Sequence, residues 1–424
     1  MASLKASAQG LEIVDRARKR MGWTKTRTVT WWQTANTSQA TLKRFWRGLA
    51  IQQENFIDIC KAVGLDSWQG IAERTTDGTP EEPQISSSRQ DWGEAPDVSG
   101  FYGRAEELAK LEQWIVGDRC RLVALLGMVG IGKTALSVML ADQIQEKFEY
   151  VIWRSLRYAP TVEDILAELI QFLGNAQETA FPEDIGRRLS LLIKSLQAHR
   201  CLLVLDEVQT VLRSGERAGQ YREGYEGYGE LFRRIAEQSH QSCLVLTSQE
   251  KPQDIVSREG ATRLVRSLKL EGLQEADAQQ VFREKGLSDP NHWGTLVKIY
   301  RGNPLWLNII SAFIQASFNG KVGDFLKLNT IVLGDISSLL HLPFERLSSE
   351  EQKIMYHLAH RQQPLSITNL LEIISNSSYS QLSESLESLE RRSLIEKQAE
   401  NDELRYTVQP VVRKYVLRQV IGNW

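Results

Sequence analysis

A glycine-rich segment, GMVGIGKT at residues 127–134, carries the residues best suited to hold phosphate. Phosphate oxygens need several backbone N–H donors at one point, and glycines let the chain fold closely enough to supply them. Lys133 reaches the β- and γ-phosphates from such a loop, and the Thr134 hydroxyl is placed to bind Mg²⁺. The apolar strand LVALL before the loop and an amphipathic helix after it favour this interpretation over a glycine-rich turn without a ligand.

We therefore expect ATP or ADP with Mg²⁺ as cofactors, and Lys133 as a residue that also serves catalysis. The residues of this segment expected to contact the nucleotide are Gly127, Val129, Gly130, Ile131, Gly132, Lys133, Thr134 and Ala135.

Two carboxylates end a second apolar strand, CLLVLDEV at residues 201–208. Ligands of parallel sheets bind at the carboxyl ends of the strands, which is where Asp206 and Glu207 are expected. Asp206 would hold Mg²⁺, and Glu207 would orient or activate the water that attacks the γ-phosphate. An acidic pair that faces solvent is the alternative.

A third strand, CLVLTS at residues 243–248, brings Thr247 and Ser248 to the same edge. Their hydroxyls are candidates to sense the γ-phosphate, and simple strand capping is the alternative.

Helix-like and strand-like segments alternate around these residues. Helices are predicted at 104–114, 133–147, 162–173, 185–198 and 230–238, and strands at 121–127, 150–156, 201–208 and 242–248. This alternation predicts a parallel sheet covered on both faces. Strands are expected to stop at about residue 260, and helices dominate through residue 325. The last hundred residues read as three helices and a hairpin, at 394–398 and 404–409, which describe a winged helix.

The predicted fold class is an α/β P-loop NTPase with a parallel sheet, followed by a helical bundle and a winged-helix domain, with an all-α helix-turn-helix-like domain at the N-terminus. The predicted boundaries are 1–74 for the N-terminal domain, 75–97 for a linker, 98–258 for the P-loop domain, 259–328 for a four-helix bundle and 329–424 for the winged helix. The linker is dense in Thr, Ser, Pro, Gly and Glu.

The overall composition is that of a soluble protein, with 42% apolar and 25% charged residues and a net charge of -2 over 424 residues. No apolar stretch is long enough for a membrane helix, so we expect a cytoplasmic protein without a membrane partner. The four cysteines have no CxxC spacing and are expected to be buried, reduced thiols.

Positive charge is concentrated at the N-terminus, where residues 1–74 hold 12 Lys and Arg against 6 Asp and Glu. Helices are predicted there at 11–22, 37–48, 52–65 and 67–73. In the second of these, the apolar residues fall on one side of a helical wheel, which is expected to pack, and the basic residues on the other. The apolar set is Leu42, Phe45, Trp46 and Leu49, and the basic set is Lys43, Arg44 and Arg47. Trp31 and Trp32 are expected in the core rather than as stacking platforms for bases.

These motifs, in this order, resemble the NB-ARC branch of the STAND ATPases from about residue 92 to the end. FYGR at 101–104 resembles the family's hhGR motif, which implies that Arg104 lies near the nucleotide. RGNPLWL at 301–307 resembles the GLPLAL motif, which implies that Pro304 packs near the adenine. The segments at 342–359 and 384–397 resemble the family's winged helix. The resemblance implies a closed resting state with ADP and an open state with ATP that self-associates.

The sequence departs from the family at two motifs. Family members often carry TSR where this chain has Thr247, Ser248 and Gln249, and the MHD motif that contacts ADP appears here with Gln409 in place of histidine. Gln409 is expected to contact the nucleotide as a neutral donor. We therefore expect weak discrimination between ATP and ADP and slow ATP hydrolysis. Such proteins usually continue into repeats that sense a ligand, and since the sequence stops at Trp424 we expect a partner protein to supply the trigger.

The N-terminal segment SQATLKRFWRG, followed by ICKAVGL, resembles phage-repressor-like (XRE-type) helix-turn-helix domains. That resemblance implies that the helix at 38–47 enters the major groove of double-stranded DNA. Lys43, Arg44 and Arg47 would contact phosphate or guanine, and Gln39 would read adenine edges. A small helical adaptor with a solvated basic face is the alternative.

Three functions are consistent with these features. The leading hypothesis is an ATPase switch whose nucleotide state controls assembly and so presents several N-terminal domains to DNA, in transcription control or DNA mobility. The second is a signalling or antiviral defence adaptor whose N-terminal domain recruits a protein. The third is a remodelling or transposition ATPase that works along DNA.

Overall fold

The structure, a computed structural model, describes residues 3–25, 29–35, 37, 39–49, 51–65, 67–68, 70–72, 89–98, 100–174, 184–361, 363–374, 377–400 and 403–421. The chain divides into two compact units, Met1–Ile85 and Ser86–Trp424. No described helix combines the length and the apolar character that a membrane span requires.

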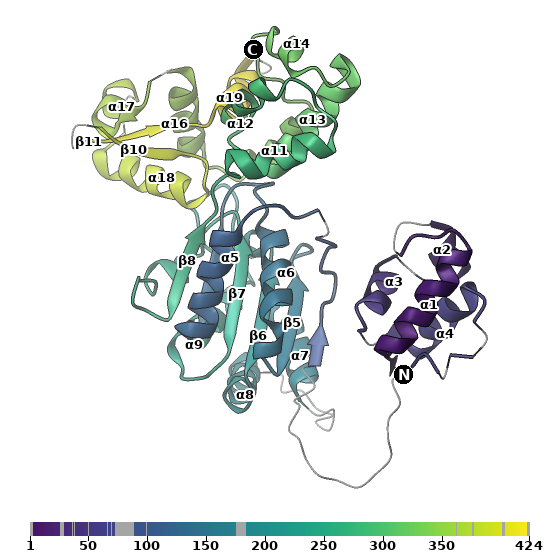
Figure 1. The fold of residues 1–424 in the computed structure, drawn as a ribbon. Helices are drawn as coiled ribbons and strands as arrows, with labels where there is room; N and C mark the ends of the chain where they lie inside the picture. The colour runs from purple at the N-terminus through teal and green to yellow at the C-terminus, as the bar shows by residue number, and fades with distance from the viewer. Residues whose placement is uncertain are drawn as a thin grey trace. The chain divides into compact units, whose positions relative to one another are not determined.

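The first unit consists of short helices around an aromatic core (Figure 1). Its elements are β1 (Ser3–Leu4), α1 (Ala8–Arg20), α2 (Val29–Thr34), α3 (Gln39–Trp46), β2 (Ile51–Gln52) and α4 (Gln53–Ala62). Trp31 has no exposed surface, and its ring centroid lies 5.8 Å from that of Trp23 and 5.7 Å from that of Trp46. Trp32 is partly buried against the same core. The prediction that both tryptophans belong to the core is confirmed.

Two details expected in the first unit are wrong. The described part of 67–73 contains no helix. The Trp68 carbonyl accepts the N–H groups of Ile71 at 2.9 Å and Ala72 at 3.1 Å in a single turn, and Ala72 then forms an antiparallel bridge with Ala6 instead of continuing a helix. Leu49 was expected on the packing side of its helix but is 44% exposed. The reason is that α3 ends at Trp46 and the chain then turns at Gly48, which has a φ of +67°, so the helical periodicity does not extend to Leu49.

The second unit begins with a parallel sheet of six strands in the order β3-β5-β6-β7-β4-β8. The strands are β3 (Arg89–Asp91), β4 (Leu122–Leu126), β5 (Tyr150–Ser155), β6 (Cys201–Asp206), β7 (Cys243–Ser248) and β8 (Val265–Lys269). Every residue of β4, β6 and β7 is buried. A strand covered on both faces has no solvent side, which is why these sequences are continuous apolar runs.

Helices cover both faces of this sheet (Figure 1). They are α5 (Ala105–Glu112), α6 (Lys133–Ile144), α7 (Val162–Leu173), α8 (Ile185–Ala198) and α9 (Gly227–Glu237), and a short α10 (Gln253–Val256) follows β7. Leu202 and Val204 of β6 pack with α5 and α6 on one face, whereas Leu203 and Leu205 pack with α7, α8 and α9 on the other. The predicted α/β fold with a parallel sheet is confirmed. All four cysteines are free and buried, as expected.

The sheet has two strands that the sequence did not reveal. β8 pairs in parallel with β4, so the expectation that strands stop at about residue 260 is wrong. β3 lies inside the expected linker and pairs in parallel with β5. Both are edge strands, and their sequences VRSLK and RQD are polar because one side of an edge strand has no neighbour to bury it. They therefore lack the apolar run that identified the central strands.

Helices follow the sheet and lead to a winged-helix-like region. The first group is α11 (Glu275–Glu284), α12 (Trp293–Ile299), α13 (Pro304–Phe318) and α14 (Val322–Leu326). The second group is α15 (Ile336–Glu345), α16 (Ser349–His360), β9 (Leu365–Ser366), α17 (Ile367–Ile373), α18 (Tyr379–Arg391), β10 (Glu396–Glu400), β11 (Glu403–Thr407) and α19 (Pro410–Ile421). The strands form an antiparallel sheet in the order β10-β11-β9, so the expected helices and hairpin are present.

A single hydrophobic core runs through both helical groups. It contains Phe282 and Trp306 from the first group together with Met355, Leu389 and Tyr415 from the second. The sheet has its own two cores, one on each face. The helices after the sheet are therefore held to one another by apolar packing.

Candidate functional site

The loop between β4 and α6 is shaped by glycines in conformations that side chains rarely adopt. Gly130 has a φ of +78° and Gly132 a φ of +100°. A Cβ atom on Gly130 would lie 2.8 Å from the Cβ of Leu305, so a larger residue has no room there. The loop ends at the first turn of α6, whose backbone N–H groups and positive dipole end favour an anion.

Lys133 is the first residue of α6, and its side chain folds back over the loop. Its ammonium donates to the carbonyl oxygens of Gly127 at 2.9 Å and Met128 at 3.0 Å. Burial lowers the pKa of Lys133 to about 8, and the charges of Asp206 and Glu207 partly oppose that shift. A phosphate in the loop would favour the charged form of Lys133, as the carboxylates of Asp206 and Glu207 do. The site is therefore suited to an anion.

Asp206, at the end of β6, accepts hydrogen bonds from hydroxyl groups of two other segments. It accepts hydrogen bonds from Thr134 at 2.9 and 3.1 Å and from Thr247 at 2.5 Å. Burial raises the pKa of Asp206, and the hydrogen bonds from Thr247 and Thr134 oppose the rise. A carboxylate beside a hydroxyl is the oxygen donor set that Mg²⁺ prefers, so Asp206 and Thr134 fit a magnesium site. Among the described residues there is no group of three or more His, Cys, Asp or Glu side chains that would hold a metal by themselves.

Glu207 follows Asp206 in a left-handed conformation with a φ of +62°. Its backbone N–H donates to the Thr247 hydroxyl at 3.1 Å, and its partly buried side chain lines the cavity in front of the loop. Burial raises the pKa of Glu207, the charge of Asp206 raises it further, and Arg157 and Lys133 act in the opposite direction. A strained non-glycine residue and a carboxylate of raised basicity at one position are features of catalytic sites.

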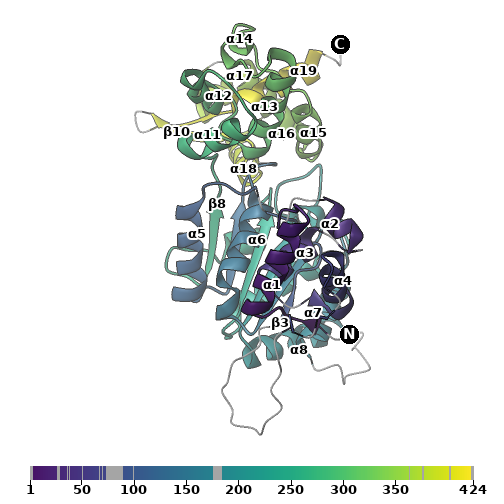
Figure 2. The same ribbon diagram turned by 45° about the vertical axis from the view of Figure 1, so that its right-hand side comes forward.

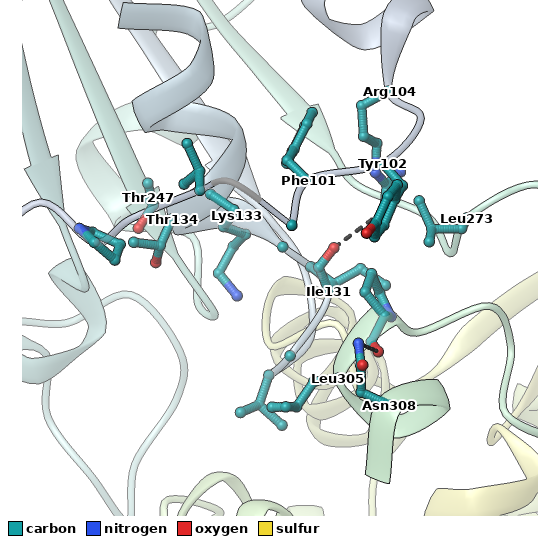
Figure 3. A pocket seen from close by; sticks show the side chains of 18 of the residues that line it. Phe101, Tyr102, Arg104, Ile131, Lys133, Thr134, Thr247, Leu273, Leu305 and Asn308 are labelled. Carbon is teal, nitrogen blue, oxygen red and sulfur yellow. Dashed lines mark hydrogen bonds between the residues drawn. The ribbon is translucent and has the colours of Figure 1, made fainter. Parts of the chain in front are cut away.

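A cavity of about 430 Å³ lies over the loop, between the sheet and the start of α13 (Figure 3). The predicted site residues that line it are Arg104, Val129, Gly130, Ile131, Gly132, Lys133, Thr134, Ala135, Glu207, Thr247 and Pro304. Gly127 and Asp206 touch this set through their hydrogen bonds with Lys133 and Thr134. Residues that are far apart in the sequence thus meet around one cavity.

The cavity has a polar side and a more apolar side. Figure 3 shows Lys133, Thr134 and Thr247 on one side, and Tyr102, Leu273, Leu305 and Asn308 toward the other. The polar side suits phosphates and the apolar side suits a base. Apart from Pro304, which was expected to pack near the adenine, the apolar lining was not predicted. The missed apolar residues, which also include Pro96, Val98, Phe101 and Val281, are ordinary apolar positions in the sequence.

Arg104, which the resemblance places near the nucleotide, lies beside the loop and lines the cavity, and its guanidinium is hydrogen-bonded to protein groups. It donates to Glu107 at 2.6 Å, to the carbonyl of Ile131 at 3.1 Å and to the carbonyl of Glu271 at 2.7 Å. Figure 3 shows its bond to Ile131. Arg104 therefore ties the phosphate loop to the segment that enters the helices.

Two predicted contacts lie elsewhere. Ser248 does not line the cavity, because its hydroxyl donates to the carbonyl of Glu250 at 2.6 Å. Gln409 lines a different cavity of about 390 Å³, which it shares with Met128 and Ile131 on another side of the loop. Gln249 does line the nucleotide-sized cavity, and its backbone N–H donates to the side chain of Gln209 at 3.1 Å.

The polar and basic residues in and just after α3 are only partly described. The side chains of Gln39 and Lys43 lie outside the described residues. Arg44 and Arg47 are exposed, while Leu42 and Phe45 are almost fully buried. For the residues described, the expected separation of a packing side and a basic side is present, except at Leu49.

Residues 104–214 match the NB-ARC domain family. An uncharacterized WD repeat-containing protein of Nostoc sp. is 44% identical over 460 residues, which cover 99% of this chain and 36% of that protein. The chain thus spans about a third of the length of this relative. A probable disease resistance protein of Arabidopsis thaliana is 25% identical over 66% of this chain and 15% of its own length. Among solved structures, the Walker-type ATPase of Pyrococcus abyssi has 18% identity and a TM-score of 0.48, covering 75% of this chain and 96% of that one.

Proposed function

We propose that this chain, whose residues 104–214 match the NB-ARC domain family, is a STAND-type nucleotide-binding switch whose bound ATP or ADP sets its state of assembly. One observation carries this proposal: Lys133 and Thr134 line one cavity that also has an apolar side, and Thr134 is hydrogen-bonded to Asp206 behind it. Phosphates would bind the loop N–H groups and Lys133, and the base would lie toward Pro304 and Leu305.

ATP hydrolysis at this site is proposed to be slow. Thr134 and Asp206 would hold Mg²⁺, which would supply positive charge to neutralise the phosphates. Glu207 accepts the proton of the attacking water, and its raised pKa increases its basicity. Gln249 lines the cavity with a neutral amide, so no side chain at that position adds charge to stabilise the transition state. Slow turnover suits a switch, because each nucleotide state then persists.

The N-terminal unit is proposed to bind double-stranded DNA when several copies assemble. Its excess of Lys and Arg, the exposed Arg44 of α3 and the exposed Arg47 just after this helix support this role. A single domain with few phosphate contacts binds weakly at physiological salt, and linkage of several copies raises the effective affinity by about 10² to 10⁴. We propose that self-association in the ATP state provides that linkage.

A second function is favoured by a different observation. Ile13, Met21 and Leu49 of the first unit are 37%, 47% and 44% exposed. Exposed apolar side chains suit a protein partner better than a phosphate backbone. In this alternative the N-terminal unit is an adaptor in signalling or defence. In both cases we propose that a sensor such as the WD repeats of the Nostoc relative supplies the trigger.

The proposal is tested by measuring the mass of the full chain in solution with ADP and with a non-hydrolysable ATP analogue. We expect a small species with ADP and a larger assembly with the analogue, and duplex DNA should stabilise the assembly. The same small species with every nucleotide would rule out a switch in assembly. If the larger species forms but ignores DNA and captures a protein, the adaptor function is correct.

A further inference from the structure

Basic residues gather at the edge of the sheet where its strands begin. All six strands are parallel, so they begin at one edge, opposite the edge that carries the nucleotide cavity. Figure 2 shows α11–α19 beyond the other end of the strands, away from this edge. Four cations lie at or just before the strand starts, in the order of the sheet from β3 through β5 and β6 to β4. We call them the cationic edge: Arg89, Lys147, Arg200 and Arg119.

Backbone hydrogen bonds hold these segments beside one another. The N–H of Arg89 donates to the carbonyl of Glu149 at 2.8 Å, and the N–H of Glu149 donates to the carbonyl of Arg200 at 2.8 Å. On the far side of β7, Arg119 lies two residues before Arg121, whose carbonyl accepts an N–H of β7 at 2.8 Å. Neighbouring strands are about 4.8 Å apart, so the steps from β3 to β4 give the row a length of about 19 Å.

Arg119 and Arg200 are like charges held near one another. Burial lowers the pKa of Arg200, and the charge of Arg119 lowers it further. The guanidinium of Arg200 lies over the ring of Phe148, with its Cζ 4.9 Å from the ring centroid. Within the part of the chain that the structure describes, no carboxylate side chain pairs with either guanidinium. Like charges repel, so this pair costs stability unless an anion binds beside it.

The backbone of Arg119 is unfavourable as well. Its φ is +56°, in the left-handed region that residues with a side chain seldom adopt and that glycine adopts freely. Glycine at this position would remove both the backbone strain and the repulsion, yet the position holds an arginine whose side chain is exposed. Strained residues of this kind are concentrated at binding sites. The side chain of Arg119 therefore serves a ligand better than it serves the fold.

The carboxylates in the same segments do not cancel the cations. Among the described residues just before the strands, the acidic ones are Asp118, Glu146 and Glu149. Asp118 pairs with Arg266 at 2.5 Å, which neutralises it. Counted as full negative charges, Glu146 and Glu149 leave the four cations of the cationic edge with a net charge of +2. The edge therefore attracts anions.

A row of this shape suits the phosphate backbone of a nucleic acid duplex. Each strand of DNA carries one phosphate per about 3.4 Å of helix axis, so a row of about 19 Å faces about five phosphates of one strand. The guanidinium fork of arginine binds phosphate through two parallel hydrogen bonds. A lipid surface would be met by exposed apolar side chains as well. At this edge, however, Phe148 is 3% exposed and Tyr150 is partly buried.

The chain that comes from the first unit enters the second unit at this edge. β3 begins at Arg89 and runs parallel to β5, so the linker before it joins the sheet beside the other cations. Ala72 and Arg89 are 17 positions apart, which a chain spans over at most about 60 Å. A duplex bound by the first unit would stay within this reach. Two weak sites joined by a tether bind one ligand more tightly than either site alone.

We propose that the cationic edge is a second nucleic-acid surface, which binds the phosphate backbone of double-stranded DNA through Arg119 and Arg200. Because only phosphates are contacted, this surface is indifferent to base sequence. The choice of DNA as the anion rests on the function proposed above, whereas the surface itself belongs entirely to the second unit. It lies at the edge opposite the nucleotide cavity, so DNA and nucleotide bind without competition.

Modification of arginines by phenylglyoxal, measured by mass spectrometry, tests the proposal in the full chain loaded with the ATP analogue. A mixed-sequence DNA duplex should protect Arg119 and Arg200 and leave Arg222 reactive. Arg222 is the matched control, because it is exposed and its guanidinium also lies over a ring, 4.8 Å from the centroid of Tyr225. It donates to the carbonyl of Thr210 just after β6, which places it at the opposite edge of the sheet.

Substitutions count the contacts. Arg119→Gln combined with Arg200→Gln should lower the slope of log affinity against log salt by about two per bound chain, whereas Arg222→Gln should leave the slope unchanged. Arg119→Gly should lower the slope by about one and keep or raise the melting temperature, because glycine relieves the left-handed backbone and the repulsion. A lower melting temperature in Arg119→Gly would contradict the proposal, since the arginine would then serve the fold.

The modification pattern separates this proposal from the DNA role of the first unit. Protection of Arg44 and Arg47 with Arg119 and Arg200 still reactive would overturn the cationic edge and leave that role intact. The reverse pattern supports the cationic edge and overturns the role of the first unit. A duplex that protects none of the four overturns both. If phosphatidylserine vesicles protect Arg119 and Arg200 and the duplex does not, the surface binds lipid and the proposal is wrong.

Discussion

The side-chain amide of Asn303 donates a hydrogen bond to the backbone carbonyl of Val129 at 2.9 Å. The same side chain accepts the N–H of Trp306 at 3.3 Å and so caps the first turn of α13. Asn303 therefore joins the helices after the sheet directly to the phosphate loop, and it is 1% exposed. The adjacent N–H of Leu305 reinforces the connection by donating to the carbonyl of Gly130 at 3.3 Å.

Asn303→Asp should weaken ADP binding by about 3- to 10-fold or more, because a lost neutral hydrogen bond is worth about 0.5–1.5 kcal/mol and the new charge repels phosphate. Aspartate keeps the acceptor that caps α13, but its charge is buried and faces the Val129 carbonyl, so the melting temperature should also fall. Asn303→Ser keeps a cap without the charge and separates the two effects. An Asn303→Asp chain that binds ADP as the parent does would show that the bond to Val129 does not position the loop.

Glu207→Gln should retain nucleotide binding and lower the rate of ATP hydrolysis by about 10² or more, because the amide preserves the shape of the side chain but cannot accept a proton. Phosphate release under single-turnover conditions measures this directly. The ATP-bound assembly should also persist longer. If Glu207→Gln hydrolyses ATP at the parent rate, another residue must activate the attacking water.

Gln249→Arg should raise the affinity for ATP by about 10-fold and leave the affinity for ADP nearly unchanged, since a charge-assisted bond to the γ-phosphate adds about 1.5 kcal/mol or more. The side chain of Gln249 lines the cavity, so an arginine there reaches into the same space. Competitive titration of an ATP analogue against ADP gives the ratio of the two affinities. Equal ratios in the variant and the parent would mean that position 249 does not face the γ-phosphate.

Arg44→Ala or Arg47→Ala, in the full chain loaded with the ATP analogue, should reduce the salt dependence of duplex DNA binding. Each lost phosphate contact lowers the slope of log affinity against log salt by about one per bound domain. Loss of a base contact would instead relax the preference at one base pair by about 1–3 kcal/mol. Phe45→Ala is the structural control, because its buried ring supports the core and its loss should unfold the unit. An absence of DNA binding at low salt would favour the adaptor.

The sequence was sufficient for features that are local. A glycine loop, a lysine and a threonine within eight residues must lie together, and an acidic pair after an apolar strand must lie at the end of that strand. The edge strands β3 and β8 were missed because polar residues suffice where one side has no neighbour. The guanidinium of Arg392 donates to the buried carboxylate of Glu250 at 2.7 Å, although the two residues are 142 positions apart and nothing in either segment of the sequence indicates that they meet. Apart from Pro304, the apolar residues that line the cavity could not be predicted either, because they come from distant segments and look in the sequence like residues of the hydrophobic core.

The central claim, that the cavity over the loop binds ATP or ADP, is tested most directly by calorimetric titration of ADP with Mg²⁺ into the parent and into Lys133→Ala. The Lys133 ammonium lies against the loop carbonyls of Gly127 and Met128 and is the main side-chain charge available to the phosphates. We predict saturable binding at one site in the parent and no measurable heat of binding in the variant, at equal thermal stability. Equal affinity in the two proteins would contradict the account.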